Sequence, residues 1–553
     1  MKDHYDYILK GTENRVLESL PFQIMDKKDR NYGAFLDKSG IIQAKHTIYR
    51  ACSMIALYCC SDSSFYHSDK LFDRILPAIE YVERVQHENG LFDYVTCNFY
   101  SAPDTAFILK KMMNFLLYLK DIERNDKEEV IYIKFNNITK NGAHGIMEGG
   151  FHTPNHRWVI ASILMMCSCL YEDDSMKEVA NWYLAEGIDC NEDGEFAEKS
   201  AGNYNRVNND AMILLSEATG DDTYDKCAVR NLKMMLQYWE MDGSVFSANS
   251  TRFDKDLVTY PKYYYTEYLL MAEKYHIPEF YQMVNTIIDI NREKGLIEPD
   301  ILIFFMRHPE WRKIDNEERF TYPDYRVFYK ESGIVRARSG NYTYTIMNGK
   351  SNFLYFHVGT MKLEMKVAGS FCEHRAFKAE TIEQEDGGFH LHQTMRGWYY
   401  LPWDEESRPE TNDWWKMDNA ARNKKMGPDL SIDVYVKELV DKTGLEVRVV
   451  TKGVDGDPFR VELAVTGADF MENDYMASYL DGSEAITVKG GEMRLSNSKD
   501  IITVGPGFGN HHFMEGKEDS EGKTKGATTL YFTDYTGFDH TIFIKNDKKC
   551  NVF

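Results

Sequence analysis

The sequence contains no run of about 18 uninterrupted apolar residues, the length that a membrane-spanning helix needs. Its first residues, MKDHYDYILKGTENRV, also lack the apolar core of a secretory signal. These two absences predict a cytoplasmic protein that does not enter a membrane. Secretion or a periplasmic location stays open if the natural chain begins upstream of this start.

Positive charge is scarce in the chain. Lys and Arg total 65 against 87 Asp and Glu, which gives a formal net charge of -22. A general nucleic-acid-binding protein needs a basic surface, so the charge balance argues against nucleic acid as a partner. An anionic substrate is still compatible, because a local basic cleft can bind one on an acidic protein.

The ten cysteines show none of the spacings typical of metal ligands. Cys59 and Cys60 lie in one apolar helical run, and Cys167 and Cys169 lie in another. Such cysteines behave as small buried hydrophobic residues in a reducing compartment.

Two different hydrophobic periods divide the chain. Up to about residue 310, apolar residues recur at i, i+3, i+4 and i+7, as in DTAFILKKMMNFLLYLKDI, and prolines are few. From about residue 325 the residues alternate between turns, as in GIVRARSGNYTYTIMNG. Helices followed by strands indicate an α+β chain of two domains rather than a doubly wound sheet. We expect a helical domain over residues 1–315 and an antiparallel β-sandwich over residues 316–553.

A loose repeat runs through the helical part. Gly90, Gly150, Gly194 and Gly243 each follow an acidic or amide residue and precede an aromatic one, at a spacing near one helical hairpin. Successive hairpins stack into a solenoid or close into a ring, which predicts an (α/α) toroid or incomplete barrel with these loops on one rim. The alternative is a set of four unrelated loop glycines.

Polar residues crowd the start of one predicted helix in GGFHTPNHRWVIASILMM, from Gly149 to Met166. Thr153 suits the N-cap and Pro154 the first helical position. The following residues then meet the free amides and the positive end of the helix dipole, which favour an anion. A plain capped helix is the competing interpretation. The candidate anion-binding residues are His152, Asn155, His156 and Arg157.

A second polar cluster precedes another helix, in NEDGEFAEKSAGNYNRVNNDAMILLSEATG. Tyr204 lies 49 residues after Asn155, about one hairpin further along the chain. Adjacent hairpins of a toroid would bring both to one face of the cleft. The other polar members of this cluster are Glu195, Glu198, Lys199 and Arg206.

An anion clamp beside a tyrosine suits β-elimination from a uronic-acid glycan. The weakly acidic C5 proton becomes removable when the adjacent carboxylate is neutralised. A base must take that proton and an acid must protonate the departing oxygen at C4. Asn155 can hydrogen-bond the carboxylate, histidine can serve as base, and cations such as Lys199 and Arg206 favour the phenolate of Tyr204.

The sequence resembles the heparinase II/III-like polysaccharide lyases. The resemblance rests on NHRW, on DGEFAEKSAGNY about one hairpin later, and on the order of the two domains. The resemblance implies an α/α toroid followed by a β-sandwich. It further implies that Asn155 or His156 neutralises the uronate, that Tyr204 is the acid and often also the base, and that a histidine, His152 or His156, assists. Lys199 departs from the arginine expected in the second motif and loses bidentate carboxylate binding.

Two further loops carry candidate substrate-binding residues, at about the same position in the hairpin. The alternative for any single one is a solvated loop or a core tyrosine. In the first loop the candidates are Tyr100 and Asp104 in FYSAPDTAF, with Asn98 just before this stretch. In the second loop they are Arg252, Lys262 and Tyr264 in SANSTRFDKDLVTYPKYYYTEY.

No cofactor or catalytic metal is expected for this chemistry. In the strand region, FHLHQ places His390 and His392 on one face of a strand, which is compatible with a structural zinc. Some members of the resembled family hold a metal in this domain. No third ligand is evident, although Cys372 and His374 lie nearby in FCEHRAF, and exposed histidines are the simpler interpretation.

Three functions therefore compete. The first is a lyase that cleaves an anionic oligo- or polysaccharide by elimination. The second is a glycoside hydrolase on the same scaffold, which needs two carboxylates across the scissile bond. The third is a glycan-binding protein without catalysis. The carboxylates available to a hydrolase are Asp104, Glu148, Glu195 and Glu198. The sequence leaves the uronic acid, the linkage, sulfation, endo or exo action, and the oligomeric state undetermined.

Overall fold

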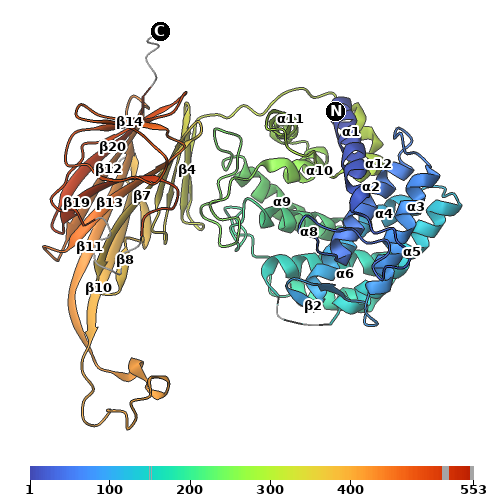
Figure 1. Ribbon diagram of the computed structural model, residues 1–553, viewed down its shortest axis with the longest axis horizontal. Helices are drawn as coiled ribbons and strands as arrows, with labels where there is room; N and C mark the ends of the chain where they lie inside the picture. Colours follow the sequence, from blue (N-terminus) through green and yellow to red (C-terminus); the bar gives the residue numbers. More distant parts are fainter. Residues whose placement is uncertain (149, 151, 386, 514–521, 548–553) are drawn as a thin grey trace. The chain divides into compact units, whose positions relative to one another are not determined.

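The structure, a computed structural model, describes residues 1–148, 150, 152–385, 387–513 and 522–547. It divides into two compact units, Met1–Trp239 with Gly243–Tyr322, and Glu240–Asp242 with Pro323–Phe553. The first unit is built from helices and the second from strands (Figure 1). The predicted order of the two architectures is therefore confirmed.

The first unit ends at Tyr322, later than the predicted residue 315. The reason lies in an extended segment that is held on a helix of the first unit. The Asn285 Nδ2 donates to the carbonyls of Asn316 and Glu318 at 3.0 and 2.7 Å, and the Phe320 amide donates to Thr286 Oγ1 at 2.9 Å. In the sequence this segment has no helical periodicity, so it resembles a linker between the two domains.

The helices of the first unit form antiparallel pairs. Within the described residues the pairs are α2 with α3, α4 with α5, α6 with α7, α8 with α9 and α10 with α11. The even-numbered helices from α2 to α10 also contact one another in succession, and His4 of α1 reaches Tyr265 of α10 at 3.0 Å. This is the predicted α/α toroid. Its helices are α1 (Lys2–Ser19), α2 (Ala44–Cys59), α3 (Asp69–Val85), α4 (Ala102–Asp121), α5 (Asp126–Ile146), α6 (Pro154–Tyr171), α7 (Asp174–Leu184), α8 (Tyr204–Thr219), α9 (Asp222–Met235), α10 (Tyr265–Tyr275), α11 (Pro278–Glu293) and α12 (Leu302–Arg307).

Sequence patterning decides which helix of a pair lies inside. From Trp158 to Ser168 every residue of α6 is buried, so this helix is apolar on all sides and belongs to the inner ring. In contrast, α3 buries mainly one stripe that includes Leu71, Ile75 and Val82. A one-sided stripe of this kind suits an outer helix with one face in solvent.

Loop glycines of the first unit lie directly against the outer helices. Gly90 has a φ of +85°, and a Cβ there would meet the Asn141 carbonyl oxygen of α5 at 2.0 Å. Gly33 makes the same approach to Pro77 of α3, with a φ of +95°. The residues on either side of Gly150 lie outside the described part of the chain, so the place of Gly150 in the repeat stays a prediction.

We expect Gly90→Ala to lower the free energy of unfolding by about 1–3 kcal/mol more than Gly187→Ala does, because overpacking is added to backbone strain. Gly187 is a matched control: its φ is also +85°, but a Cβ there would meet nothing within 4 Å. Urea denaturation of both variants checks this. Equal losses would mean that the close approach to α5 contributes nothing.

The second unit is a sandwich of two sheets. Their strand orders are β15-β14-β17-β18-β20-β12-β11-β10-β9 and β16-β19-β13-β7-β6-β5-β4-β3, with β8 on β7. All described pairs are antiparallel except β16 with β19. The strands are β3 (Tyr325–Tyr329), β4 (Ile334–Ser339), β5 (Tyr342–Met347), β6 (Leu354–Val358), β7 (Met361–Phe371), β8 (His374–Ala376), β9 (Thr381–Glu385), β10 (Gly388–Tyr400), β11 (Lys424–Glu438), β12 (Gly444–Lys452), β13 (Pro458–Thr466), β14 (Phe470–Glu472), β15 (Ala477–Tyr479), β16 (Ala485–Thr487), β17 (Met493–Ser496), β18 (Ile501–Gly505), β19 (Thr528–Tyr535) and β20 (Asp539–Asp547); a small hairpin, β1 (Phe92–Tyr94) and β2 (Asn98–Ser101), belongs to the first unit.

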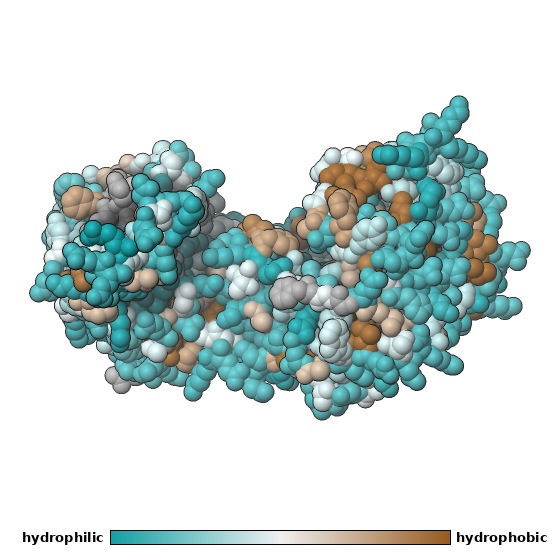
Figure 2. All heavy atoms as spheres, turned by 90° about the horizontal axis from the view of Figure 1, so that it is seen from below, coloured by the Kyte–Doolittle hydropathy of each residue, from teal (hydrophilic) through white to brown (hydrophobic). Residues whose placement is uncertain are grey.

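Alternation along the strands builds the core of the sandwich. In β11, Leu430, Ile432, Val434 and Val436 are buried in one apolar cluster between the sheets. The residues between them, such as Tyr435, face the other side. No described helix is both long and apolar enough to cross a membrane. The face drawn in Figure 2 is mostly hydrophilic, with apolar residues in small groups.

Candidate active site

Three neighbouring inner helices begin with the polar residues predicted from the sequence. Helix α6 packs against both α4 and α8. The start of α4 is capped by Ser101, whose Oγ accepts from the Asp104 amide at 3.3 Å. At the start of α8, Ser200 Oγ accepts from the Tyr204 amide at 3.0 Å. Hydrogen bonds of this kind fix the direction of the chain at each junction and so place the side chains that follow.

Asn155 and Tyr204 are joined by a chain of contacts. The Asn155 Nδ2 donates to both carboxylate oxygens of Glu198, at 2.8 and 2.9 Å. Arg252 approaches the same carboxylate, with Nε 3.4 Å from Oε1. The Arg252 guanidinium lies 4.9 Å from the centre of the Tyr204 ring, and Phe253 packs edge-on against that ring. Asn155 and Tyr204 are therefore connected through one carboxylate and one guanidinium.

Exposure differs sharply within this cluster. Asn155 is 0% exposed and Glu198 is buried, whereas the Arg252 side chain is 31% exposed. Burial raises the pKa of Glu198, and the hydrogen bond from Asn155 and the charge of Arg252 oppose that rise. The amide and the carboxylate thus form a buried support for a guanidinium that reaches solvent.

His156 lies on the α4 side of the same helix end. Its ring packs edge-on against Phe107 at 6.1 Å. Lys45 binds Asp104 at 3.0 Å and lies 4.5 Å from the centre of the Phe107 ring. Burial lowers the pKa of His156 to about 4, against the opposing charge of Asp104. The imidazole is consequently neutral at physiological pH and can accept a proton.

Because the pKa of His156 is about 4 in the folded chain and about 6.5 in an unfolded one, the unfolded state binds more protons between these values. The free energy of unfolding should therefore fall as the pH falls through this window, by more in the wild type than in His156→Gln. Urea denaturation of both proteins at several pH values tests this. Parallel pH profiles would contradict the burial of His156 as a neutral group.

His152 and Arg157 lie in different surroundings from Asn155 and His156. The His152 ring is 6.2 Å from that of Tyr183 on α7. Arg157 Nη1 pairs with Glu186 at 2.5 Å. His152, Arg157 and Tyr183 line a small cavity together with Trp182 and Gly150. The four residues predicted around the start of α6 are therefore divided between two environments.

The other predicted substrate-binding residues have partners within the toroid. Lys199 pairs with Glu195 at 3.3 Å. Arg206 lies 3.5 Å from Asp210 in α8, and the same carboxylate binds Lys110 at 2.6 Å. These contacts pair Lys199 and Arg206 with carboxylates of the toroid.

Two predicted aromatic residues have opposite placements. Tyr264 is buried: its hydroxyl donates to the Ala201 carbonyl at 2.5 Å and its ring packs edge-on against Trp239. The prediction that Tyr264 contacts a sugar is therefore wrong, because its ring is part of the core. Tyr100 is exposed and stacks on His87 at 4.0 Å.

Lys45, Phe107 and Phe253 belong to the cluster but were not predicted. Lys45 lies in the first turn of α2, after the glycine turn at Gly33, which is the pattern followed at the other junctions. That position was the available signal. The two phenylalanines carry none, because an aromatic residue in a loop does not reveal which ring it contacts.

The carboxylates considered for hydrolysis do not form an open pair. Glu195 and Glu198 are buried, and Asp104 is held by Lys45 and Ser101. Glu148 is exposed on the surface. A hydrolase needs one acid and one base or nucleophile facing the scissile bond from two sides. These four residues, as the structure describes them, do not show that arrangement.

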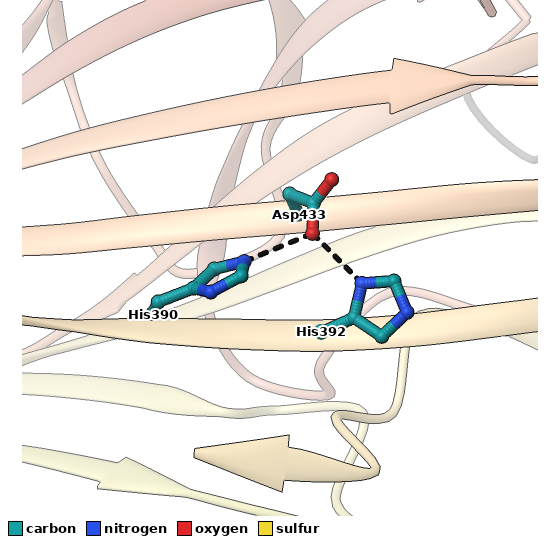
Figure 3. A group of neighbouring side chains, drawn as sticks. All are labelled: His390, His392 and Asp433. Carbon is teal, nitrogen blue, oxygen red and sulfur yellow. Dashed lines mark hydrogen bonds and ion pairs between the residues drawn. The ribbon is translucent and has the colours of Figure 1, made fainter. Parts of the chain in front are cut away.

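In the sandwich, His390 and His392 converge on a third residue. His390 Nε2 and His392 Nδ1 lie 2.9 and 2.8 Å from the same oxygen of Asp433 (Figure 3). Asp433 lies directly opposite His392 in the pairing of β10 with β11, so all three occupy one sheet face. Their ligand atoms lie within 4.8 Å of one another. Two imidazole nitrogens and a carboxylate oxygen form a donor set that zinc accepts.

Comparisons with known proteins identify the fold. No protein-family model and no curated protein matches the chain. Among solved structures, heparinase III has a TM-score of 0.54 and 10% identity, over 98% of this chain and 85% of that one. A Paenibacillus xanthan lyase gives 0.54 and 9%, over 99% of this chain, which spans 57% of the lyase. The Streptomyces coelicolor A3 chondroitin AC lyase, solved in complex with chondroitin sulphate, gives 0.52 and 10%, over 99% and 79%.

These similarities extend over nearly the whole chain and include both domains. The resemblance to heparinase-type lyases predicted from the sequence is thereby confirmed as a resemblance of fold. At 9–10% identity, the fold is what the comparison establishes.

Proposed function

We propose that the chain is a lyase that cleaves uronic-acid-containing oligo- or polysaccharides by β-elimination. The observation that supports this most is the contact chain from Asn155 through Glu198 and Arg252 to Tyr204. It places a cation for a carboxylate beside a phenol. The lyase fold of the similar structures agrees with the proposal.

In the proposed mechanism, Arg252 binds and neutralises the uronate carboxylate. Its Nε forms an ion pair with Glu198 at 3.4 Å, while its outer nitrogens have no hydrogen-bond partner among the described residues. Asn155, first predicted to neutralise the uronate itself, is fully buried, and we infer that it acts by holding Glu198. A fixed guanidinium aimed at the developing charge stabilises the enolate-like intermediate without reorganisation.

Proton transfer then falls to the two remaining groups. His156 is neutral and takes the C5 proton, which is acidified by the neutralised carboxylate. The C4–O bond breaks as the C4–C5 double bond forms, and the departing oxygen receives a proton from the hydroxyl of Tyr204. Tyr204 acting as both acid and base is the alternative for this step.

The test is a panel of glucuronan, hyaluronan, chondroitin, heparan sulfate and alginate oligosaccharides incubated with the purified chain. Elimination creates a conjugated double bond with absorbance at about 235 nm, which follows from the acid–base scheme above. New reducing ends without this absorbance would instead identify a hydrolase. Binding with no new products from any substrate would identify a glycan-binding protein.

We also propose that His390, His392 and Asp433 hold a structural zinc ion. Bound there, the metal would supply a cross-link between β10 and β11 and take no part in the elimination. The observation that supports it is the convergence of both imidazoles on one carboxylate oxygen. The hydrogen-bonded trio alone is the alternative.

Zinc binding is measured by competition with a chromophoric chelator, after dialysis of the full chain against a stronger chelator. We expect about one zinc per chain for the wild type and loss of this binding in His392→Ala. His374→Ala, a histidine of the same unit outside the trio, is the control and should bind as the wild type does. Equal binding by the wild type and His392→Ala would exclude this site.

A further inference from the structure

A small cavity lies beside the first turn of α6 and is separate from the Tyr204 cluster. It has a volume of about 220 Å³ and is lined by Gly150, His152, Arg157, Trp182 and Tyr183. Pockets that hold a whole small-molecule ligand usually measure about 300–1,000 Å³. The cavity is therefore the right size for one substituent and part of a ring.

Three hydrogen-bonding atoms of this lining are buried without a partner among the described residues. They are His152 Nε2, Arg157 Nε and Tyr183 Oη. Tyr183 is only 4% exposed, so its hydroxyl cannot rely on bulk solvent. An unsatisfied buried polar group is destabilising, and a ligand that supplies hydrogen-bonding oxygens would relieve this cost.

The charges around the cavity favour an anion. Arg157 brings a cation, and the positive end of the α6 dipole lies at the same turn, where Thr153 makes no side-chain cap. The nearest carboxylate, Glu186, binds the Nη1 of Arg157 and leaves its Nε unused. Burial and the charge of Arg157 both lower the pKa of His152, so this imidazole is neutral and donates or accepts one hydrogen bond.

A sugar ring has a surface to rest on at the mouth of the cavity. Trp182 lines it and is 66% exposed. An exposed indole face beside hydrogen-bond donors is a typical carbohydrate contact, because the ring stacks on the apolar face of the sugar. Neither Asn155 nor His156 lines this cavity, so the ligand group it holds is not the uronate at the cleavage point.

We propose that this cavity is a subsite for an anionic substituent, a sulfate ester or a carboxylate, of a sugar unit next to the one that is cleaved. His152, Arg157 and Tyr183 would bind the oxygens while Trp182 stacks on the ring. The inference deepens the proposed function and rests on it for the identity of the ligand as part of a glycan.

Monosaccharide probes test the subsite apart from catalysis, because they have no glycosidic bond to eliminate. The full chain is titrated with N-acetylglucosamine 6-sulfate, glucuronic acid and neutral N-acetylglucosamine. The signal is the tryptophan fluorescence change of the wild type minus that of Trp182→Phe. We expect at least one acidic sugar to bind about tenfold more tightly than the neutral one. Which of the two binds distinguishes sulfate from carboxylate.

Arg157→Gln and His152→Gln should each remove this preference, whereas Trp415→Ala, an exposed tryptophan of the other unit, should leave it unchanged. Equal binding of acidic and neutral sugars, or a preference that survives in both variants, would overturn the subsite. That outcome would leave the absorbance assay for elimination unaffected. Conversely, an acidic-sugar preference without any elimination would remove the proposed reaction and retain the anion site.

Discussion

Tyr204→Phe is expected to lower turnover by about 10²–10⁴-fold, the usual contribution of a positioned general acid. The fold should survive the change. The Tyr204 hydroxyl makes no hydrogen bond to any described residue, so its removal leaves no partner unsatisfied, and the ring keeps its contacts with Arg252 and Phe253. Initial rates from the absorbance assay, with thermal melting in parallel, measure both effects.

Tyr263→Phe is the matched control for this variant. Tyr263 is an exposed tyrosine of the same unit, and its ring carries the guanidinium of Arg206 at 5.1 Å, a contact that phenylalanine preserves. It should turn over substrate as the wild type does. Turnover of Tyr204→Phe within about twofold of the wild type would remove the phenol from the mechanism, since that loss is far below a general acid's contribution.

The sequence was sufficient to predict the fold because its two periodicities reflect burial directly. The sequence itself displays both patterns: the apolar run from Trp158 to Ser168 and the alternation of Leu430, Ile432, Val434 and Val436. The closure of the toroid was harder to predict from the sequence. It depends on contacts such as His4 with Tyr265, which lie far apart in the chain and follow no local pattern.

The meeting of Asn155 with the Tyr204 loop was predictable because hairpins of similar length bring equivalent junctions together. The division of the residues around the start of α6 between two environments was not predictable. Successive helical residues point about 100° apart, so Arg157 faces a different neighbour from Asn155. Which neighbour occupies each direction depends on α7, whose Trp182 and Tyr183 carried no signal of their own.

Two other residues show the same limit. The apposition of Asp433 with His392 depends on strand register, and a shift by one residue would send the carboxylate to the other face. Tyr264 looked like a cleft residue because it follows a polar loop. It is in the core because its hydroxyl finds a backbone carbonyl, at Ala201, and a tyrosine with a partner of that kind can be buried.

Arg252→Gln is expected to lower kcat/KM by about 10²–10³-fold, the range for losing one preorganised stabiliser of developing negative charge. The variant loses the charge that faces the substrate, whereas the support formed by Asn155 and Glu198 keeps its own hydrogen bonds. If Arg252 acts mainly on the developing enolate, kcat should fall along with kcat/KM; a rise in KM alone would mean uniform binding of the carboxylate.

Arg252→Lys separates charge from geometry. Lysine retains the cation but cannot direct one nitrogen to Glu198 while presenting two others outward, so an intermediate loss is expected. Arg319→Gln is the control: Arg319 is an exposed arginine of the same unit that pairs with Asp289 at 2.7 Å. Rates are measured with the oligosaccharide that the panel identifies. Wild-type kcat/KM in Arg252→Gln would mean that the uronate is neutralised elsewhere, and the contact between Arg252 and Glu198 would then serve the stability of the loop alone.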